Sequence, residues 1–341
     1  MRKVNPSDVK VKIFDVAIIG GGSAGVMAHL RAVLNANHAL LIRGNSWTQK
    51  RARSTWIHSV DNIPGMHNIK NPVRLSSKQT LEWISSHSHL HQFSTVIQTK
   101  AINIEKKDQL FLIHHQKKDD ASVSYSYAKH VVLATGVMDI QPKIEGEMEP
   151  FFMYANRGDL IYCVRCDGHH TIGKKISILG DKDSAVYIGK LMMERYGHKN
   201  IDIVSTHRRP KYSQDALKLA KNLGMRIHKK EIKSIYGDSR SGLRGFKLEE
   251  GNEIQCSKAI VALGIIAYNH LLLHLKGAVD IEGRAIVSEK FESSVANVFV
   301  VGDLVSGKKM QIYTGWDAAV DAADEIDRRV RALASNMNDE S

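Results

Sequence analysis

The sequence predicts an α/β protein built from two βαβ units, and three features carry this prediction. The first is an apolar run over residues 15–19 that leads into a glycine-rich turn over residues 20–25 and then into a helix through Ala36. The second is the same order of strand and glycine from Lys175 to Gly180. The third is the length of 341 residues, which exceeds what one hydrophobic core usually supports. We therefore expect two three-layer domains.

The first glycine turn has the GxGxxG spacing of a dinucleotide-binding motif, at Gly20, Gly22 and Gly25. Its glycines let backbone N–H groups approach a pyrophosphate at the N-terminus of the helix that follows. A second short strand is expected over residues 38–42. The acid that usually follows this strand and holds a ribose hydroxyl is missing, and Arg43 stands there instead. Arg43 suits a 2′-phosphate, which makes NADP a rival to FAD at this site, or it is a surface residue at a strand end.

The second βαβ unit lies inside the chain. A helix over residues 184–196 and a strand over residues 201–204 follow Gly180, and the apolar run over residues 259–264 is the expected exit strand. A last strand over residues 297–303 ends in Gly302 and Asp303 and precedes a helix over residues 316–332. A carboxylate at such a strand end can reach a sugar or ribityl hydroxyl at the carboxyl edge of a sheet.

A Cys-x-x-Cys pair, Cys163 and Cys166, is followed directly by Asp167. Such a pair can close a disulfide or hold a low-pKa thiolate, and the acid can move the proton that thiol–disulfide exchange requires. The alternative is half of a zinc site, which needs four ligands, usually from two paired clusters. Cys256 has no partner nearby, and His169 and His170 do not complete a usual finger spacing. The pattern favours redox chemistry, and we expect no metal.

Composition limits the partners and the compartment. The hydrophobic fraction of 43% is typical of a globular protein, and three cysteines make no disulfide scaffold. No stretch approaches the roughly 18 apolar residues of a membrane span, and the apolar run after the basic N-terminus is too short for a signal peptide. We expect a cytoplasmic protein without membrane or nucleic-acid partners. The net charge of +12 indicates either a solvated basic surface or an acidic protein partner.

The order of motifs resembles the low-molecular-weight thioredoxin reductases over nearly the whole chain. The matching segments are GGGSAG (20–25), DNIPG (61–65), ATG (134–136), CVRCDG (163–168), HRR (207–209) and VFVVGD (298–303). The resemblance implies a homodimer with FAD bound by a discontinuous domain, 1–140 and 265–341. It also implies an inserted NAD(P)H-binding domain, 141–264, that carries the disulfide.

The resemblance also implies which residues act. Cys163 and Cys166 match the redox pair and Asp167 matches its acid, and we expect Cys166 to face the flavin. FAD contacts are expected at ten residues: Gly20, Gly22, Ser23, Ala24, Gly25, Asn62, Ala134, Gly302, Asp303 and Gln311. NADP contacts would fall on Gly180, Ala185, Arg208 and Arg209.

The second glycine motif departs from the family pattern. Lys182 replaces its middle glycine, and Asp181 and Asp183 add negative charge beside the expected phosphate. Ser213 stands where the family has a third arginine of the 2′-phosphate motif. NADPH and a protein carrier such as ferredoxin therefore both remain as electron donors.

Two further departures lie near the expected flavin. A basic, aromatic stretch over residues 47–56 replaces a glycine-rich loop, and the chain is shortened around Gln311. Four aromatic residues are candidates to stack on a ring, with ordinary core packing as the alternative: Trp47, Trp56, Tyr313 and Trp316.

We thus expect an FAD-dependent thiol–disulfide oxidoreductase that reduces a small thioredoxin-like protein. The alternatives are a dithiol oxidase running in reverse and a flavin-binding regulatory protein without turnover.

Overall fold

The computed structural model describes residues 12–44, 53, 59–118, 120, 122–207, 209–249 and 251–339, and no side chain is described for Ala334 or residues 336–339. The chain divides into two compact units. Unit 1 comprises Met1–Ala52, Val73–Met138 and Ile266–Ser341, and unit 2 comprises Arg53–Pro72 and Asp139–Ile265. The segment 53–72 groups with unit 2, although the sequence predicts it within the FAD-binding domain. Which unit binds which cofactor stays a prediction.

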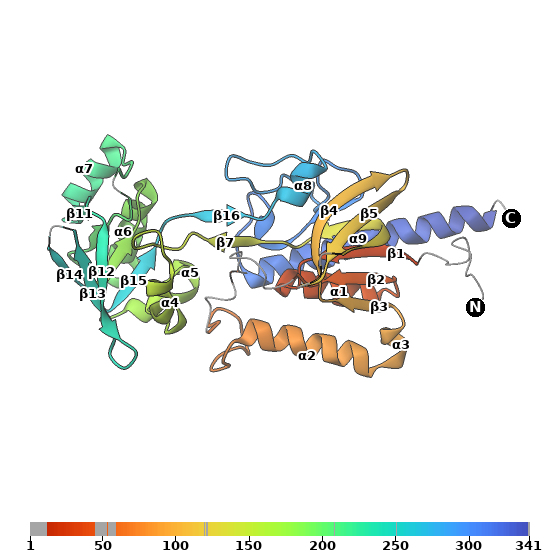
Figure 1. Ribbon diagram of the computed structural model, residues 1–341, viewed down its shortest axis with the longest axis horizontal. Helices are drawn as coiled ribbons and strands as arrows, with labels where there is room; N and C mark the ends of the chain where they lie inside the picture. Colours follow the sequence, from red (N-terminus) through yellow and green to blue (C-terminus); the bar gives the residue numbers. More distant parts are fainter. Residues whose placement is uncertain are drawn as a thin grey trace. The chain divides into compact units, whose positions relative to one another are not determined.

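Unit 1 is built on a sheet that has seven strands in the described part of the chain (Figure 1). The strands are β1 (Ile13–Ile19), β2 (Ala39–Ile42), β3 (Ser94–Ile97), β4 (Lys100–Lys107), β5 (Leu110–Gln116), β6 (Val123–Leu133) and β17 (Val298–Val300). β3, β2, β1 and β6 pair in parallel in that order. The other edge of β6 is shared, because its first half pairs antiparallel with β5 and its last three residues pair parallel with β17.

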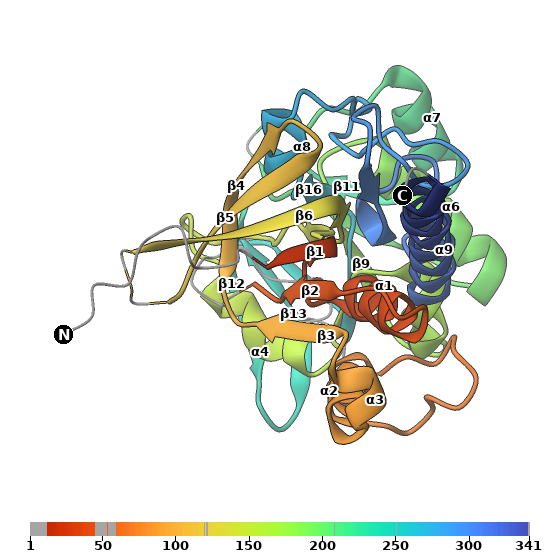
Figure 2. The ribbon, with the colours of Figure 1, turned by 90° about the vertical axis from the view of Figure 1, so that its right-hand side faces the viewer.

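Two helices of unit 1, α1 (Ser23–Leu34) and α9 (Ile312–Asp339), lie side by side (Figure 2). The buried face of α9 carries small side chains such as Ala319 and Ala322, which allow close approach between helices. Arg31 of α1 donates two hydrogen bonds, of 2.6 and 3.0 Å, to the carboxylate of Asp324 on α9. The helix predicted over residues 316–332 is thus longer at both ends.

The remaining helical segments of unit 1 are short or lie outside this pair. They are α2 (Pro72–Ser86), α3 (Ser88–His91), α8 (His270–His274) and the 3₁₀ turn η4 (Gly302–Leu304). Among the described residues, no helix combines the length and the apolar character that a membrane crossing requires.

Unit 2 holds a parallel sheet in the order β11, β10, β9, β15, β8. Its strands are β8 (Leu160–Ile161), β9 (Ile176–Leu179), β10 (Asp202–Val204), β11 (Arg226–His228) and β15 (Lys258–Val261). A smaller antiparallel sheet contains β12 (Ile232–Asp238), β13 (Gly242–Leu248) and β14 (Glu253–Gln255). The helical segments are α4 (Glu149–Asn156), α5 (Val164–Asp167), η3 (Gly168–Thr171), α6 (Asp183–Tyr196) and α7 (Gln214–Asn222). β7 (Val137–Asp139) pairs with β16 (Ile265–Ala267) where the chain passes between the units.

Side chains of the parallel strands in unit 2 alternate between two cores. Ile178 and Ile203 pack in the core that contains residues of α6 and α7. Leu179 and Val204 pack in the core that contains α4 and the smaller sheet, including Phe246. Both faces of the parallel sheet are therefore covered, which confirms the predicted three-layer α/β architecture for this unit.

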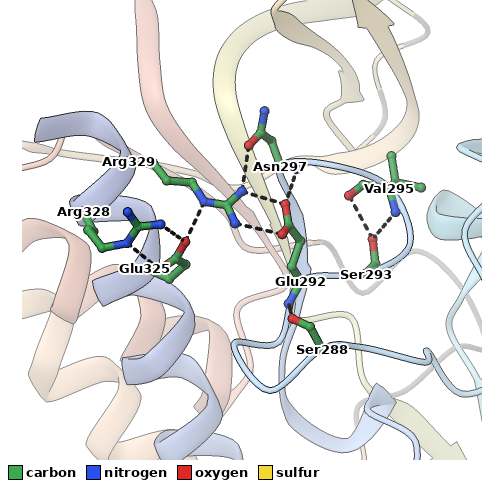
Figure 3. A network of polar contacts seen from close by, with 8 residues as sticks. All are labelled: Ser288, Glu292, Ser293, Val295, Asn297, Glu325, Arg328 and Arg329. Carbon is green, nitrogen blue, oxygen red and sulfur yellow. Dashed lines mark hydrogen bonds and ion pairs between the residues drawn. The ribbon is translucent and has the colours of Figure 1, made fainter. Parts of the chain in front are cut away.

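A network of charged groups holds α9 to the segment that precedes β17 (Figure 3). Arg329 donates to both carboxylate oxygens of Glu292, at 2.6 and 2.8 Å, and to Glu325 at 2.8 Å. Its guanidinium also lies 5.2 Å from the ring centroid of the buried Phe299 in β17. Because β17 leads directly to Gly302 and Asp303, this network fixes the strand that carries two of the expected FAD residues.

Replacing Arg329 by lysine should lower the free energy of unfolding by about 1–3 kcal/mol, because one ammonium cannot replace a bidentate bond and a second carboxylate contact. Arg328→Lys is the matched control, since within the described part of the chain Arg328 pairs with Glu325 alone and its side chain is 68% exposed. The control should cost less than about 0.5 kcal/mol. Denaturant unfolding of the two variants tests this, and equal losses would contradict the proposed role of Arg329.

The same network gives stability a pH dependence. The hydrogen bond from Arg328, aided by Arg329, lowers the pKa of Glu325 to about 2 from its ordinary 4.5. Because the folded pKa is depressed, this stabilisation is complete above the ordinary pKa and is lost as the pH falls toward the folded one. The difference in unfolding free energy between the wild type and Arg329→Lys should therefore narrow from about pH 5 to about pH 3.

Candidate functional site

Cys163 and Cys166 form a closed disulfide in unit 2, with their Cα atoms 5.3 Å apart. The chain leaves the edge strand β8 at Ile161, and Cys163 is the residue that caps α5. The Sγ atom of Cys163 accepts a hydrogen bond of 3.2 Å from the backbone N–H of Cys166. This N–H would stabilise negative charge on the Cys163 sulfur once the disulfide opens.

Asp167 ends α5 and lines a pocket together with Cys163. Burial raises the pKa of Asp167 to about 6, with a further increase from the charge of Asp61 and opposing effects from His170, His169 and Arg53. A carboxyl group with such a pKa keeps a proton in a fraction of molecules near neutral pH. The structure thus brings together all three residues predicted to be catalytic.

The same pocket has an ion-paired wall. The guanidinium of Arg53 donates to the carboxylate of Asp139 at 2.9 Å, and both side chains are largely buried, 13% and 8% exposed. Arg53 also lies 3.4 Å from the carbonyl oxygen of Tyr162, the residue before Cys163. The sequence places Arg53 in the basic stretch over residues 47–56 but does not predict its pairing with Asp139, because the two residues stand 86 positions apart.

The first glycine turn in unit 1 is tightly packed against the end of β6. Gly20 has φ +119°, and a Cβ there would stand 2.3 Å from the carbonyl oxygen of Ala134. A Cβ on Gly25 would stand 1.9 Å from the carbonyl oxygen of Gly20. Gly22, by contrast, has no heavy atom within 4 Å of such a Cβ and begins α1 without a side-chain cap. The turn therefore leaves open space at the helix N-terminus, which fits the pyrophosphate of FAD.

Other expected FAD residues of unit 1 surround the same helix end. A Cβ on Gly302 would lie 3.0 Å from the Cβ of Ala24, and one on Gly315 would lie 3.4 Å from the Cα of Gly302. Ser23 accepts a hydrogen bond of 2.7 Å from the indole N–H of Trp316. The predicted residues Gly20–Gly25, Ala134 and Gly302 thus gather at one point of the fold, with Asp303 next in η4.

The structure also gives the positions of the other residues predicted near the flavin. Gln311 is buried directly before α9, and Tyr313 is 44% exposed on that helix. Trp316 is hydrogen-bonded within unit 1, and Asn62 belongs to the turn of unit 2 over residues 61–65. Trp47 and Trp56 lie outside the described residues. Arg43 is exposed beside the glycine turn, where its carbonyl oxygen accepts from the N–H of Gly21 at 3.1 Å.

The second glycine turn, in unit 2, is occupied by a carboxylate of the protein itself. Asp181 accepts hydrogen bonds from the hydroxyls of Ser205 and Thr206, at 2.7 and 2.6 Å. It also accepts from the backbone N–H groups of Thr206 and His207, at 2.8 and 3.1 Å. These donors stand at the end of β10, where the resemblance places the 2′-phosphate motif. The carboxylate takes the hydrogen bonds that an incoming phosphate would need.

The rest of this turn is also internally paired. Asp183 accepts from the N–H of Ser213 at 2.7 Å, and the hydroxyl of Ser213 caps α7. Ala185 is fully buried, and a Cβ on Gly180 would stand 2.6 Å from its Cβ.

Three basic residues of the expected NADP motif remain to be placed: Lys182, Arg208 and Arg209. Lys182 and Arg209 are exposed, and Arg208 lies outside the described residues. Four donors at the end of β10 are therefore already engaged by Asp181, which disfavours a phosphate of NADPH there. The sequence predicts Asp181 only as a repulsive charge, because its four hydrogen bonds depend on a strand end 24 residues away.

Comparisons with known proteins agree with this geometry. Residues 14–323 match the family described as pyridine nucleotide-disulphide oxidoreductase. A thioredoxin reductase of Mycoplasma genitalium is 26% identical over 346 residues, which cover 96% of this chain and 99% of that protein. A 34.2 kDa protein in the rubredoxin operon of Clostridium pasteurianum is 27% identical over 89% of this chain and 92% of its own. The crystal structure of a thioredoxin reductase from Streptococcus pyogenes has the same fold, with a TM-score of 0.76, 21% identity, and coverage of 94% and 99%.

Gly22→Val should give folded but colourless protein. The φ of −75° at Gly22 suits a valine, and the added methyl groups would enter the space expected for the pyrophosphate. We expect flavin content to fall at least about tenfold, while loss of the N-cap glycine costs only about 1 kcal/mol of stability. Absorbance at the flavin bands and a thermal melt test this.

Gly25→Val is the comparison variant, since its Cβ would meet backbone and should prevent folding. If Gly22→Val retains full flavin, the turn does not hold the cofactor.

Proposed function

Because the chain belongs to the pyridine nucleotide-disulphide oxidoreductase family, we propose that it passes electrons from FAD through Cys163 and Cys166 to a small thioredoxin-like protein. The chain is a thioredoxin reductase-like flavoprotein disulfide oxidoreductase. The observation that carries the proposal is the closed disulfide on α5, in the same pocket as the partly buried carboxyl group of Asp167. The names of the relatives support the thioredoxin-like partner.

Bound FAD supplies two-electron redox chemistry, and the residues at the N-terminus of α1 would hold it. Gly20, Gly22 and Gly25 shape the turn, and Gly302 and Asp303 follow β17 at the same place. Two electrons and two protons convert the Cys163–Cys166 disulfide into two thiols. We expect Cys166 to be the sulfur that exchanges electrons with the flavin.

The dithiol then reduces the partner by thiol–disulfide exchange. The N–H of Cys166 favours the thiolate of Cys163, which attacks one sulfur of the partner disulfide. The leaving sulfur of the partner takes a proton, for which Asp167 lies in the same pocket. Cys166 then attacks Cys163 in the mixed disulfide, which closes the intramolecular disulfide and releases a partner with two thiols.

The electron donor that we propose is an acidic protein carrier such as ferredoxin. Two observations support it: the occupied turn at Asp181 disfavours NADPH, and the net charge of +12 would attract an acidic protein. A dithiol oxidase running the same steps in reverse is the second candidate, since exchange at Cys163 is reversible. By resemblance we also expect a cytoplasmic homodimer.

Cys163→Ser and Cys166→Ser should each lower protein-disulfide reduction at least about a hundredfold while FAD stays bound, because neither single thiol can complete the exchange. Cys256→Ser is the matched control, because burial raises the pKa of the Cys256 thiol to about 12 and keeps it neutral. Release of thiols from an oxidised thioredoxin, with reduced methyl viologen as donor, is the measurement. Wild-type activity in the Cys163→Ser/Cys166→Ser double variant would end the proposal, and an inactive wild type would leave only a flavin-binding regulatory protein.

Anaerobic stopped-flow reduction of the flavin should distinguish the donors. Reduced ferredoxin or flavodoxin should bleach the flavin at a rate that falls about tenfold or more between low and physiological salt, as expected for steering of an acidic carrier. NADPH should bind at least about tenfold more weakly than a neutral glycine turn would allow, because its phosphate must displace the Asp181 carboxylate. Fast bleaching by micromolar NADPH, at a rate indifferent to salt, would show an ordinary NADPH-linked reductase instead.

A further inference from the structure

Three side chains of unit 2 converge directly after the redox helix. His169 and His170 lie on η3, and Asp61 lies in the turn over residues 61–65. The Nε2 atoms of His169 and His170 stand 3.1 and 2.8 Å from the same oxygen, Oδ2 of Asp61. The donor atoms of all three side chains lie within 4.8 Å of one another.

The arrangement concentrates three ligand groups beside the redox pocket, which His170 also lines. The two imidazole rings have centroids 4.1 Å apart. Both Nε2 atoms contact the same carboxylate oxygen of Asp61. All three side chains are partly exposed, between 27% and 44%, so an ion from solution can reach them. A third histidine, His67, holds the same turn, with its Nε2 atom 3.0 Å from the carbonyl oxygen of Asp61.

The distances suit a small transition-metal ion. Imidazole nitrogen and carboxylate oxygen bind zinc at about 2.0–2.2 Å, so tetrahedral ligands stand about 3.3 Å apart. The two separations between an imidazole nitrogen and the carboxylate oxygen, 2.8 and 3.1 Å, need to widen by only a few tenths of an ångström, and all three donor atoms lie within 4.8 Å of one another. Two imidazoles and one carboxylate leave a fourth position for water or an added ligand.

We propose that Asp61, His169 and His170 form a binding site for a divalent transition-metal ion of the zinc class. The ion replaces the two N–H contacts to Asp61 with direct bonds to both imidazoles and the carboxylate. It ties the turn at Asp61 to η3, which follows Cys166 and Asp167 without a break. The cysteines are not among the ligands, because both sulfurs are held in the disulfide.

Calorimetric titration of the oxidised, FAD-loaded protein with zinc chloride, after treatment with a chelator, tests the site. We expect one ion per chain with micromolar affinity, and no binding of Mg²⁺, which prefers oxygen ligands. Asp61→Asn, His170→Gln and the double variant His169→Gln/His170→Gln should weaken zinc at least about a hundredfold. The matched control is His87→Gln/His89→Gln, which removes a partly exposed pair with rings 5.7 Å apart and should keep the affinity of the wild type.

A thermal melt of the same proteins gives a second readout, since an ion that binds the folded state raises the melting temperature. Zinc should raise the melting temperature of the wild type and of the control, but not that of the three site variants. Equal zinc binding by all variants would assign the ion to other histidines among the 17 of the chain and would overturn the proposal. Absence of zinc binding by the wild type would overturn it too. The titration needs neither an electron donor nor a partner, so its outcome is independent of the proposed function.

Discussion

Contact of backbone against backbone at the first glycine turn is the constraint on which the organisation of unit 1 depends. Gly25 approaches the carbonyl oxygen of Gly20 so closely that a single added carbon would stand 1.9 Å away, and Gly20 approaches Ala134 in the same manner. The ends of β1 and β6 and the start of α1 are therefore locked together. The N–H groups of the first turn of α1 point into the remaining open space, where Gly302 brings the end of β17. An FAD site follows from this packing without any specialised side chain.

Unit 2 repeats the frame of strand, turn and helix, but its turn serves a different purpose. The contact between Gly180 and Ala185 keeps the strand close to the helix, as in a nucleotide-binding turn. The anion at the strand end, however, is Asp181, which is part of the chain and loses no translational freedom when it binds there. A free phosphate competes at a disadvantage with such a tethered group. One architecture thus supports a cofactor site in one unit and an internal cross-link in the other.

The sequence was sufficient to predict the α/β class, the strands next to the glycine turns and the family, and the structure and the comparisons confirm these. β1 and β9 are buried on both faces, so they appear as continuous apolar runs. The ends predicted for the last helix were wrong, because α9 extends beyond residues 316–332 in both directions and Gly315 lies inside it at close approach to Gly302. The partners of Asp181 and the convergence of Asp61 with His169 were not predictable, because contacts between residues 24 and 108 positions apart leave no local pattern.

The shared edge of β6 has a consequence for synthesis of the protein on the ribosome. β17 pairs with the last three residues of β6, yet it is made about 165 residues later. At about 5–20 residues per second, the growing chain carries that apolar strand edge unpaired for roughly ten to thirty seconds. The larger segment of unit 2, Asp139–Ile265, is made during this interval, and its other segment, Arg53–Pro72, is made before it. The unit encoded in the middle of the gene can therefore finish folding first, while the unit that begins the chain waits for its final strand and needs protection from aggregation.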